Sequence, residues 1–254
     1  MYEFQGLDAV EESGLSSTRG ISERIEFGNF NSRDEGLYLI TRDAPTPAEK
    51  EVIDDVPFMQ GVYDFSSMLG ERVFQNRLIS YEFQLFNVPY RERKIAEIKL
   101  KQKLMGLGNS ALRDSHDAGF YWLGKCSSVV IEDDETYKNL KAVITFDCYP
   151  FMISEKQEWD DVWDTVNFNL DIFQKTFYKV EDSTDVVLFN TGSVSATLKV
   201  TASKPLLIKK GNKEYSFNAG TTQDDSFRID VGKSVLSVRG FGTVKFEFVK
   251  EVLG

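Results

Sequence analysis

The chain has 254 residues, of which 41% are hydrophobic and 28% are charged, and its formal net charge is −10 at pH 7. These proportions are close to the globular average and exclude a chain that is disordered throughout. The excess of Asp and Glu argues against specific nucleic-acid binding, which requires a basic surface. The length allows one large domain or two domains of ordinary size.

The N-terminal residues contain no basic stretch followed by an apolar one, so the sequence shows no signal peptide. No apolar run reaches about 18 residues, and we therefore expect no spanning helix and no membrane partner. Cys126 and Cys148 each lie in a strand-like run. They could pair across adjacent strands, but synthesis in a cytoplasmic compartment favours two buried free thiols.

The first part of the chain reads as loops and short strands. Residues 11–19 have the Ser, Thr and Gly content of a loop, and residues 24–30 and 36–41 have the composition of strands. Residues 44–48 contain two prolines and are expected to form a stiff extended connection.

Residues 77–86 show the clearest strand pattern of the first half. Ile79, Tyr81, Phe83 and Leu85 alternate with polar residues. This period of two predicts one buried face and one wet face, and the buried face needs a cover from a helix or from a second sheet.

Residues 90–105 predict an α-helix that supplies this cover. The segment has good helix formers and no internal Gly or Pro, and it ends at Gly106 and Gly108, which predicts a left-handed C-cap. Ala96, Leu100 and Leu104 recur at a spacing of four residues, which predicts an apolar stripe. The residues that flank this stripe are Ile95, Ile98 and Met105.

The remainder of this helix is mostly basic, which is unusual in an acidic chain. Two interpretations are open: the basic residues form the solvated back of the helix, or they contact an acidic surface of a neighbouring chain. The candidate contact residues are Arg91, Lys94, Lys99, Lys101 and Lys103.

A polar loop is predicted at residues 109–119, followed by strands at residues 120–131 and 140–149. The acidic run at residues 132–135 is expected to be the hairpin loop between these strands. Pro150 ends this part of the chain. We place a domain boundary directly after it, which gives domains of residues 1–150 and 151–254.

The second half has seven short strand-like runs, separated by Gly- or Asp-containing turns, and no helical pattern. This predicts an antiparallel β-sandwich. Gly211 and Asn212 are the signal of a two-residue hairpin turn. The expected strands are residues 186–189, 197–201, 206–210, 214–217, 227–231, 235–239 and 244–249.

The single histidine, His116, lies between Asp114 and Asp117. One imidazole and two loop carboxylates lack the ligand spacing of a zinc site, so we expect a solvent-facing loop and no metal.

Carboxylates gather near the predicted domain junction, at Glu158, Asp160, Asp161 and Asp164. Two of them could serve a glycosidase, but any acidic chain offers such pairs, and the neighbouring Trp159 and Trp163 are expected to anchor the junction. The sequence has no EF-hand loop, phosphate-binding Gly-rich loop or nucleophile elbow. We therefore predict neither an enzyme nor a cofactor.

Several aromatic-rich segments follow one another in a fixed order along almost the whole chain. They are residues 56–66, 70–77, the strand to Phe86, the helix at 88–104, the strand entry at 119–125, and residues 146–150 and 158–168. Asn190-Thr-Gly192 and Asn218-Ala-Gly220 follow in the second half. In this ordered set, although in no single motif, the chain resembles the distal tail (Dit) protein family of long-tailed, siphovirus-type bacteriophages.

The resemblance implies a mainly β fold: an N-terminal β-sandwich of α+β character with a helix and a protruding hairpin, then a galectin-like antiparallel β-sandwich. It implies a structural protein of the virion, made in the host cytoplasm and located at the distal end of the tail. Six copies would form a ring around the tail channel. The implied partners are other copies of the chain, the tail tube protein, the tail-tip or tail-associated protein, and receptor-binding or other baseplate proteins.

The galectin-like domain departs from sugar-binding galectins, which stack a Trp on the sugar among His, Arg and Asn residues. Here the last tryptophan is Trp163 and the single histidine is His116. Both lie outside the expected sugar-binding face, which favours protein docking over lectin activity. The alternative function is a carbohydrate-binding module or an accessory of a cell-wall hydrolase.

Overall fold

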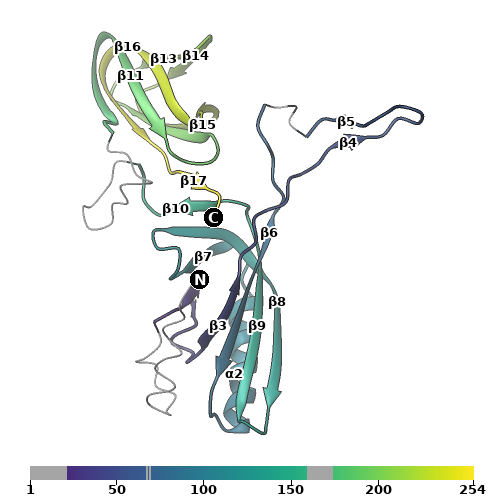
Figure 1. The fold of residues 1–254 in the computed structure, drawn as a ribbon. Coiled ribbons are helices and arrows are strands. Elements are labelled where there is room, and N and C mark those ends of the chain that lie inside the picture. The colour runs from purple at the N-terminus through teal and green to yellow at the C-terminus, as the bar shows by residue number, and fades with distance from the viewer. Residues whose placement is uncertain (1–21, 67, 69, 159–173) are drawn as a thin grey trace. The chain divides into compact units, whose positions relative to one another are not determined.

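The computed structural model describes residues 22–66, 68, 70–158 and 174–254 (Figure 1). The chain divides into two compact units: unit 1, residues 1–152 with Gly254, and unit 2, residues 153–253. Strands predominate in both units, and every strand pairing with a defined register is antiparallel. Within the described ranges, no helix has the length and hydrophobicity that a bilayer crossing requires.

Unit 1 is built on one long antiparallel sheet. Its strand order is β2-β1-β7-β8-β9-β6-β3, so β2 and β3 form the two edges. The strands are β1 (Ile25–Phe27), β2 (Phe30–Asn31), β3 (Tyr38–Asp43), β6 (Arg77–Leu85), β7 (Ser110–Asp114), β8 (Phe120–Asp134) and β9 (Asn139–Cys148).

This sheet folds over on itself to make a sandwich. The ring of Phe27 on β1 lies 5.0 Å from that of Phe146 on β9, although β7 and β8 separate the two strands in the sheet. Phe146 in turn lies 6.1 Å from Tyr81 on β6. Edge-on ring contacts at these distances are favourable and bury large apolar surfaces. The core of unit 1 therefore lies between the two halves of one sheet.

The alternation predicted for β6 is confirmed, because Ile79, Tyr81 and Phe83 are fully buried while the intervening residues are partly exposed. The helix is confirmed as α2 (Tyr90–Met105), and it packs against β8. The cover of the β6 face therefore includes the opposite half of the same sheet, and the expectation that the helix alone supplies it is wrong.

A separate hairpin, β4 (Ile53–Asp54) with β5 (Tyr63–Asp64), is inserted between β3 and β6 (Figure 1). At its base, Lys50 N donates to Val73 O over 2.7 Å and Gln75 N donates to Ala48 O over 2.8 Å. It is a two-stranded sheet of its own, as the protruding hairpin of the resemblance implies.

Three sequence predictions in unit 1 need correction. Residues 24–30 are not one strand but the hairpin β1–β2, which turns at Gly28 with a φ of 58°. The predicted loop at 109–119 contains β7, and the acidic run at 132–135 belongs largely to β8, whose turn follows at residues 135–138. β7 was not predicted because only Leu112 and Asp114 of this strand are buried, and a buried carboxylate does not fit an apolar strand pattern.

Two short strands, β10 (Met152–Ser154) and β17 (Glu251–Val252), pair with each other, and β10 begins at the last residue of unit 1. Unit 2 contains a six-stranded antiparallel sheet. Its strands are β11 (Phe177–Asn190), β12 (Ala196–Ala202), β13 (Leu206–Lys210), β14 (Lys213–Phe217), β15 (Gly220–Ile229) and β16 (Gly232–Glu247).

The sheet of unit 2 forks along β16. β11 pairs with β16 over its whole length, but β13 pairs with residues 236–240 of β16 and β12 with residues 244–247. The fork lies at Gly240 and Gly242, whose φ values of 133° and 141° disfavour any residue with a Cβ. The sequence prediction of a turn between two strands here is therefore wrong, because hydrogen bonding to β11 continues through both glycines.

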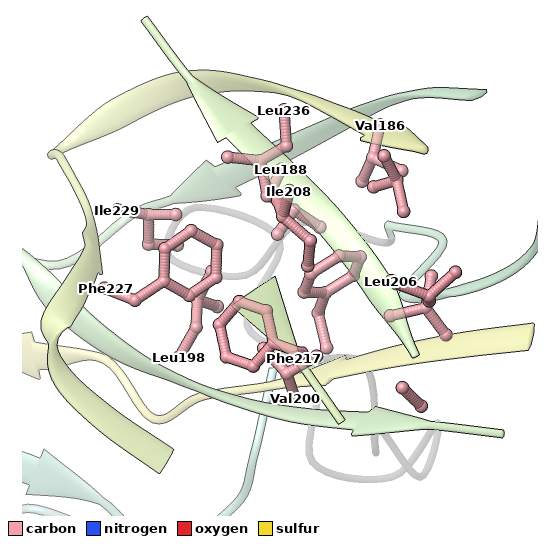
Figure 2. Packing of buried hydrophobic residues seen from close by; sticks show 14 of the residues in the cluster. Val186, Leu188, Leu198, Val200, Leu206, Ile208, Phe217, Phe227, Ile229 and Leu236 are labelled. Carbon is pink, nitrogen blue, oxygen red and sulfur yellow. The ribbon is translucent and has the colours of Figure 1, made fainter. Parts of the chain in front are cut away.

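The two arms of this fork enclose the core of unit 2, which Figure 2 shows as a cluster of buried side chains. Phe227 on β15 lies 5.1 Å from Phe217 and 4.7 Å from Tyr215 on β14, although β14 and β15 are opposite edges of the sheet. The predicted β-sandwich is confirmed. The hairpin at Gly211 and Asn212 is confirmed as well.

Candidate functional site

Helix α2 has two apolar faces that point in opposite directions. Leu100 and Leu104 are buried, whereas Ile98 is 56% exposed. At about 100° per residue, Ile95, Ile98 and Met105 fall on the side opposite to Leu100 and Leu104. The predicted stripe is buried at Leu100 and Leu104, whereas the residues expected to flank it lie on the exposed side. We call the exposed set Ile95, Ile98 and Met105 the outer stripe.

Arg93 fastens the inner face of α2 to the β8–β9 hairpin. Its side chain is fully buried and forms ion pairs with Asp133 and Glu135, and it donates to Val88 O over 2.6 Å. A buried guanidinium requires such partners, because an unpaired charge is costly inside a protein. Sequence reasoning missed this role; the acidic run at 132–135 was the available signal.

The C-terminus of α2 also differs from the prediction. Gly106 has a φ of −80°, so the expected left-handed C-cap is absent at this glycine, and the chain leaves the helix in a right-handed conformation. Leu107 N donates to Leu104 O over 3.4 Å at this end.

Three of the five predicted contact residues pair with acidic residues of unit 1. Lys94 and Lys101 both bind Glu97, at 3.1 Å and 2.7 Å, and Lys103 binds Glu35. Glu97 has a lowered pKa because its hydrogen bonds to Lys101 and Lys94 favour the charged form. These pairs are partly exposed and contribute little to stability.

Arg91 and Lys99, the other two predicted residues, are exposed. Neither forms an ion pair with any described carboxylate. Together with the outer stripe they make an apolar surface with positive charge on it. The predicted residues thus lie on one helix, but they do not form one uniform patch.

A shallow, open groove of about 370 Å³ lies beside α2, between the helix and residues 34–36. Ile95 of the outer stripe and Lys99 belong to its lining. The other lining residues are Asp34, Glu35, Gly36, Leu85, Val88, Glu92 and Ala96.

A second cluster of charged residues lies inside the unit 1 sandwich. Arg42 Nε donates to Asp114 Oδ2 over 2.7 Å, and the Arg42 guanidinium also pairs with Asp117. Tyr81 OH donates to Asp114 over 2.9 Å. Burial raises the pKa of Tyr81 well above its ordinary value. The cluster joins β3, β6 and β7 and fixes the fold of the sheet.

His116 belongs to this cluster, so the prediction of a solvent-facing loop is wrong. Its ring Nδ1 lies 2.7 Å from Asp114 Oδ1, and its backbone N donates to the same oxygen over 2.9 Å. The hydrogen bond with Asp114 raises the pKa of His116, against the effect of burial. Burial alone would raise the pKa of Asp114, but these hydrogen bonds and the charge of Arg42 hold it below its ordinary value. Burial raises the pKa of Asp117.

The described ranges hold no group of three or more His, Cys, Asp or Glu side chains arranged to bind a metal ion. Cys126 and Cys148 are free and buried. Burial raises the pKa of the Cys126 thiol to about 11 and that of Cys148 to about 12. A thiol with so high a pKa is a poor nucleophile at neutral pH.

Of the carboxylates considered for glycoside cleavage, Glu158 is buried and lies 3.5 Å from Lys250 Nζ within unit 2. Asp160, Asp161 and Asp164 lie outside the described residues, as do Trp159 and Trp163. The tryptophan anchor therefore stays a prediction.

No protein-family model and no curated protein matches the sequence. Among solved structures, the chain is similar to the SPP1 Dit (gp 19.1) protein, described as a paradigm of the hub adsorption apparatus in phages that infect Gram-positive bacteria. The TM-score is 0.66 at 11% identity, over 91% of this chain and 99% of that chain.

The baseplate of phage P2 in its activated conformation is a weaker match. The form with Ca has a TM-score of 0.44 at 7% identity over 91% and 98% of the two chains. The form with Sr has a TM-score of 0.39 at 8% identity over 90% and 98%. The SPP1 Dit match alone shows that the chain has this fold over nearly its whole length, and it confirms the resemblance found in the sequence as a likeness of fold.

Proposed function

We propose that this chain, with its Dit fold, is a structural component of a phage tail. Six copies form a ring around the tail channel and join the tail tube to the baseplate or tip. The observation that carries the proposal is the extent of the likeness to SPP1 Dit, which covers 91% of this chain and 99% of that one. A match of this extent includes both units in the same order along the chain. A chance similarity between two single β-sandwiches would include only one unit.

The surfaces of unit 1 support assembly. α2 carries an apolar outer stripe with exposed basic residues, and the β4–β5 hairpin has no buried face. Exposed apolar patches on a soluble protein mark interaction sites. The charged cluster around Asp114 holds the sandwich together. Asp114, Asp117 and His116 therefore have a structural role.

We assign the ring-forming role to residues 1–150 and an outward-facing, galectin-like role to residues 151–254. In this arrangement the ring contacts the tail tube protein on one side and the tail-tip or tail-associated protein on the other. Unit 2 then offers a docking surface to receptor-binding or other baseplate proteins. The protein is made in the host cytoplasm and resides in the virion, at the distal end of the tail, without a catalytic reaction of its own.

The test is the mass and shape of the purified full chain. Size-exclusion chromatography with light scattering should give a species of six times the 28.9 kDa chain mass, and negative-stain images should show rings with a central hole. A glycan array on the same sample addresses carbohydrate binding. A chain that stays monomeric at all concentrations, also with its tail tube protein, and that binds glycans would overturn the ring proposal.

A further inference from the structure

The β4–β5 hairpin presents apolar side chains that no described part of the chain covers. We call residues 51–66 the arm. Ile53 and Tyr63 are about half exposed and Phe58, near its tip, is fully exposed. Phe58 also has a φ of 69°, a conformation rare for a bulky residue. A two-stranded hairpin is marginal by itself in water, so a cover for these side chains would stabilise it.

The arm is also acidic. It contains four carboxylates, Glu51, Asp54, Asp55 and Asp64, and no Lys, Arg or His. None of the four forms an ion pair with a described residue. An arm that is both apolar and negatively charged fits a partner surface that is apolar and positively charged.

Helix α2 offers that surface within the same sequence. Its outer stripe is exposed, and the helix has six basic residues against Glu92 and Glu97. Arg91 and Lys99 lie beside the stripe without an ion-pair partner among the described residues. The acidic run near α2 does not fill this need, since Asp133 and Glu135 already bind Arg93 on the inner face.

We propose that the arm of one copy lies along the outer stripe of α2 of the next copy. This contact rests on the proposed ring and names the surfaces that would close it. The lengths agree: residues 51–56, which precede the turn at residues 57–58, span about 20 Å when extended, and α2 from Arg91 to Met105 spans about 21 Å.

Two observations place this contact between copies. In the single chain both surfaces are exposed, so neither covers the other. The arm joins β3 to the Arg77 end of β6, whereas α2 follows the Leu85 end of the same strand. A contact that uses different surfaces on its two sides is head-to-tail, and such contacts close into a ring when the rotation permits.

Site-directed cross-linking tests the contact. One full-length chain carries Phe58→Cys, the other Ile98→Cys, and the mixture is mildly oxidised. We expect a reducible heterodimer in several-fold higher yield than with Val235→Cys, a residue on β16 that is about as exposed as Ile98. The native thiols do not compete, because both are buried. Asp54→Lys with Asp55→Lys in the first chain should lower the yield, and Arg91→Asp with Lys99→Asp in the second should restore it.

Equal yields for Ile98→Cys and Val235→Cys would overturn the arm contact. So would a chain carrying both Phe58→Cys and Ile98→Cys that closes on itself as a cross-linked monomer. The outcomes separate this contact from the proposed function. If rings form but the cross-linking is not selective, the ring proposal stands and the arm contact is wrong. If the cross-linking is selective but no six-copy particles form, the arm contact stands and the ring proposal is wrong.

Discussion

Arg42 on β3 and Asp114 on β7 are joined by a 2.7 Å hydrogen bond, although β8, β9 and β6 separate their strands in the sheet. The bond exists because the sheet folds over and brings its two halves face to face. Asp114 is buried and also accepts from Tyr81 and His116. One carboxylate therefore holds three segments of the unit 1 sandwich together.

Replacing Asp114 with Asn should destabilise the protein by about 3 kcal/mol, because Arg42 and Tyr81 then lose a buried charged acceptor. The free energy of unfolding is measured by urea denaturation of the full chain. The matched control is Glu26→Gln, which breaks the half-exposed pair with Arg24 and should cost less than about 1 kcal/mol. Equal losses in the two variants would contradict the assigned role of Asp114.

The same cluster predicts a pH dependence. The pKa of His116 is raised in the folded state, so His116 contributes stability below its ordinary pKa of 6.5 and loses this contribution as the pH rises through the folded value. The pKa of Asp114 is lowered, so its contribution is present above 3.8 and is lost as the pH falls through the folded value. Their joint contribution is largest between these two values.

His116→Gln is the variant that reports this effect. We expect it to lower the free energy of unfolding more at about pH 5 than at about pH 8, because the stabilisation that comes with the raised pKa of His116 declines as the pH rises above 6.5. Urea denaturation at both pH values measures the difference. A loss that is the same at both would show that His116 contributes through packing and not through its charge.

The parts of the fold that were predictable are those in which a local pattern and the tertiary packing agree. β6 alternates because Ile79, Tyr81 and Phe83 all face the core, and Gly211 and Asn212 turn a hairpin by local backbone preference. The failures arise where packing overrides the pattern. Long-range partners decide whether Asp114 lies in a strand or a loop.

The candidate site was predictable only in outline, for the same reason. The composition predicted α2 and its positive charge. It did not predict that Arg93 lies on the inner face with Leu100 and Leu104, or that a separate outer stripe exists on the opposite side. Ile98 and Leu100 are equally apolar, and only the position of β8 decides which of them is buried. A buried Arg93 depends on Asp133 and Glu135, about 40 residues further along the chain.

Arg93→Leu should loosen the attachment of α2 to the β8–β9 hairpin, because Asp133 and Glu135 lose the cation that holds them. We expect the thermal midpoint to fall by about 5 °C and amide exchange to increase in residues 90–96 and 133–139. Arg91→Leu, an exposed change on the same helix, is the control and should leave both measurements near the wild-type values. Unchanged exchange in the hairpin would contradict the role of Arg93 as its anchor.

Unit 2 should fold without unit 1, since its buried side chains form one cluster from β11 to β16 and the residue after it. A fragment of residues 153–254 is expected to show a β-type circular dichroism spectrum and a cooperative urea transition. Phe227→Ala in that fragment should reduce its stability by about 3–5 kcal/mol, because the ring is fully buried between Tyr215 and Phe217. A fragment without a transition would place the folding boundary elsewhere in the chain.

Reversing Lys99, Lys101 and Lys103 to Glu should weaken assembly while each subunit stays folded, because partly exposed helix charges contribute little to the fold. The structure sharpens this prediction. Lys101 and Lys103 already bind Glu97 and Glu35, so Arg91→Glu with Lys99→Glu is the cleaner change. We expect the dissociation constant of the oligomer to rise about tenfold or more, and the wild type to respond in the same direction when salt rises from about 0.05 to about 0.5 M.

Lys209→Glu with Lys233→Glu is the matched control, since it makes the same change in charge on exposed residues of unit 2. Light scattering over a concentration series gives the dissociation constants, and circular dichroism reports the fold. If both double variants weaken assembly equally, general repulsion in an acidic protein explains the loss and α2 has no special part in the contact. If the α2 variant unfolds, Arg91 and Lys99 support the subunit itself.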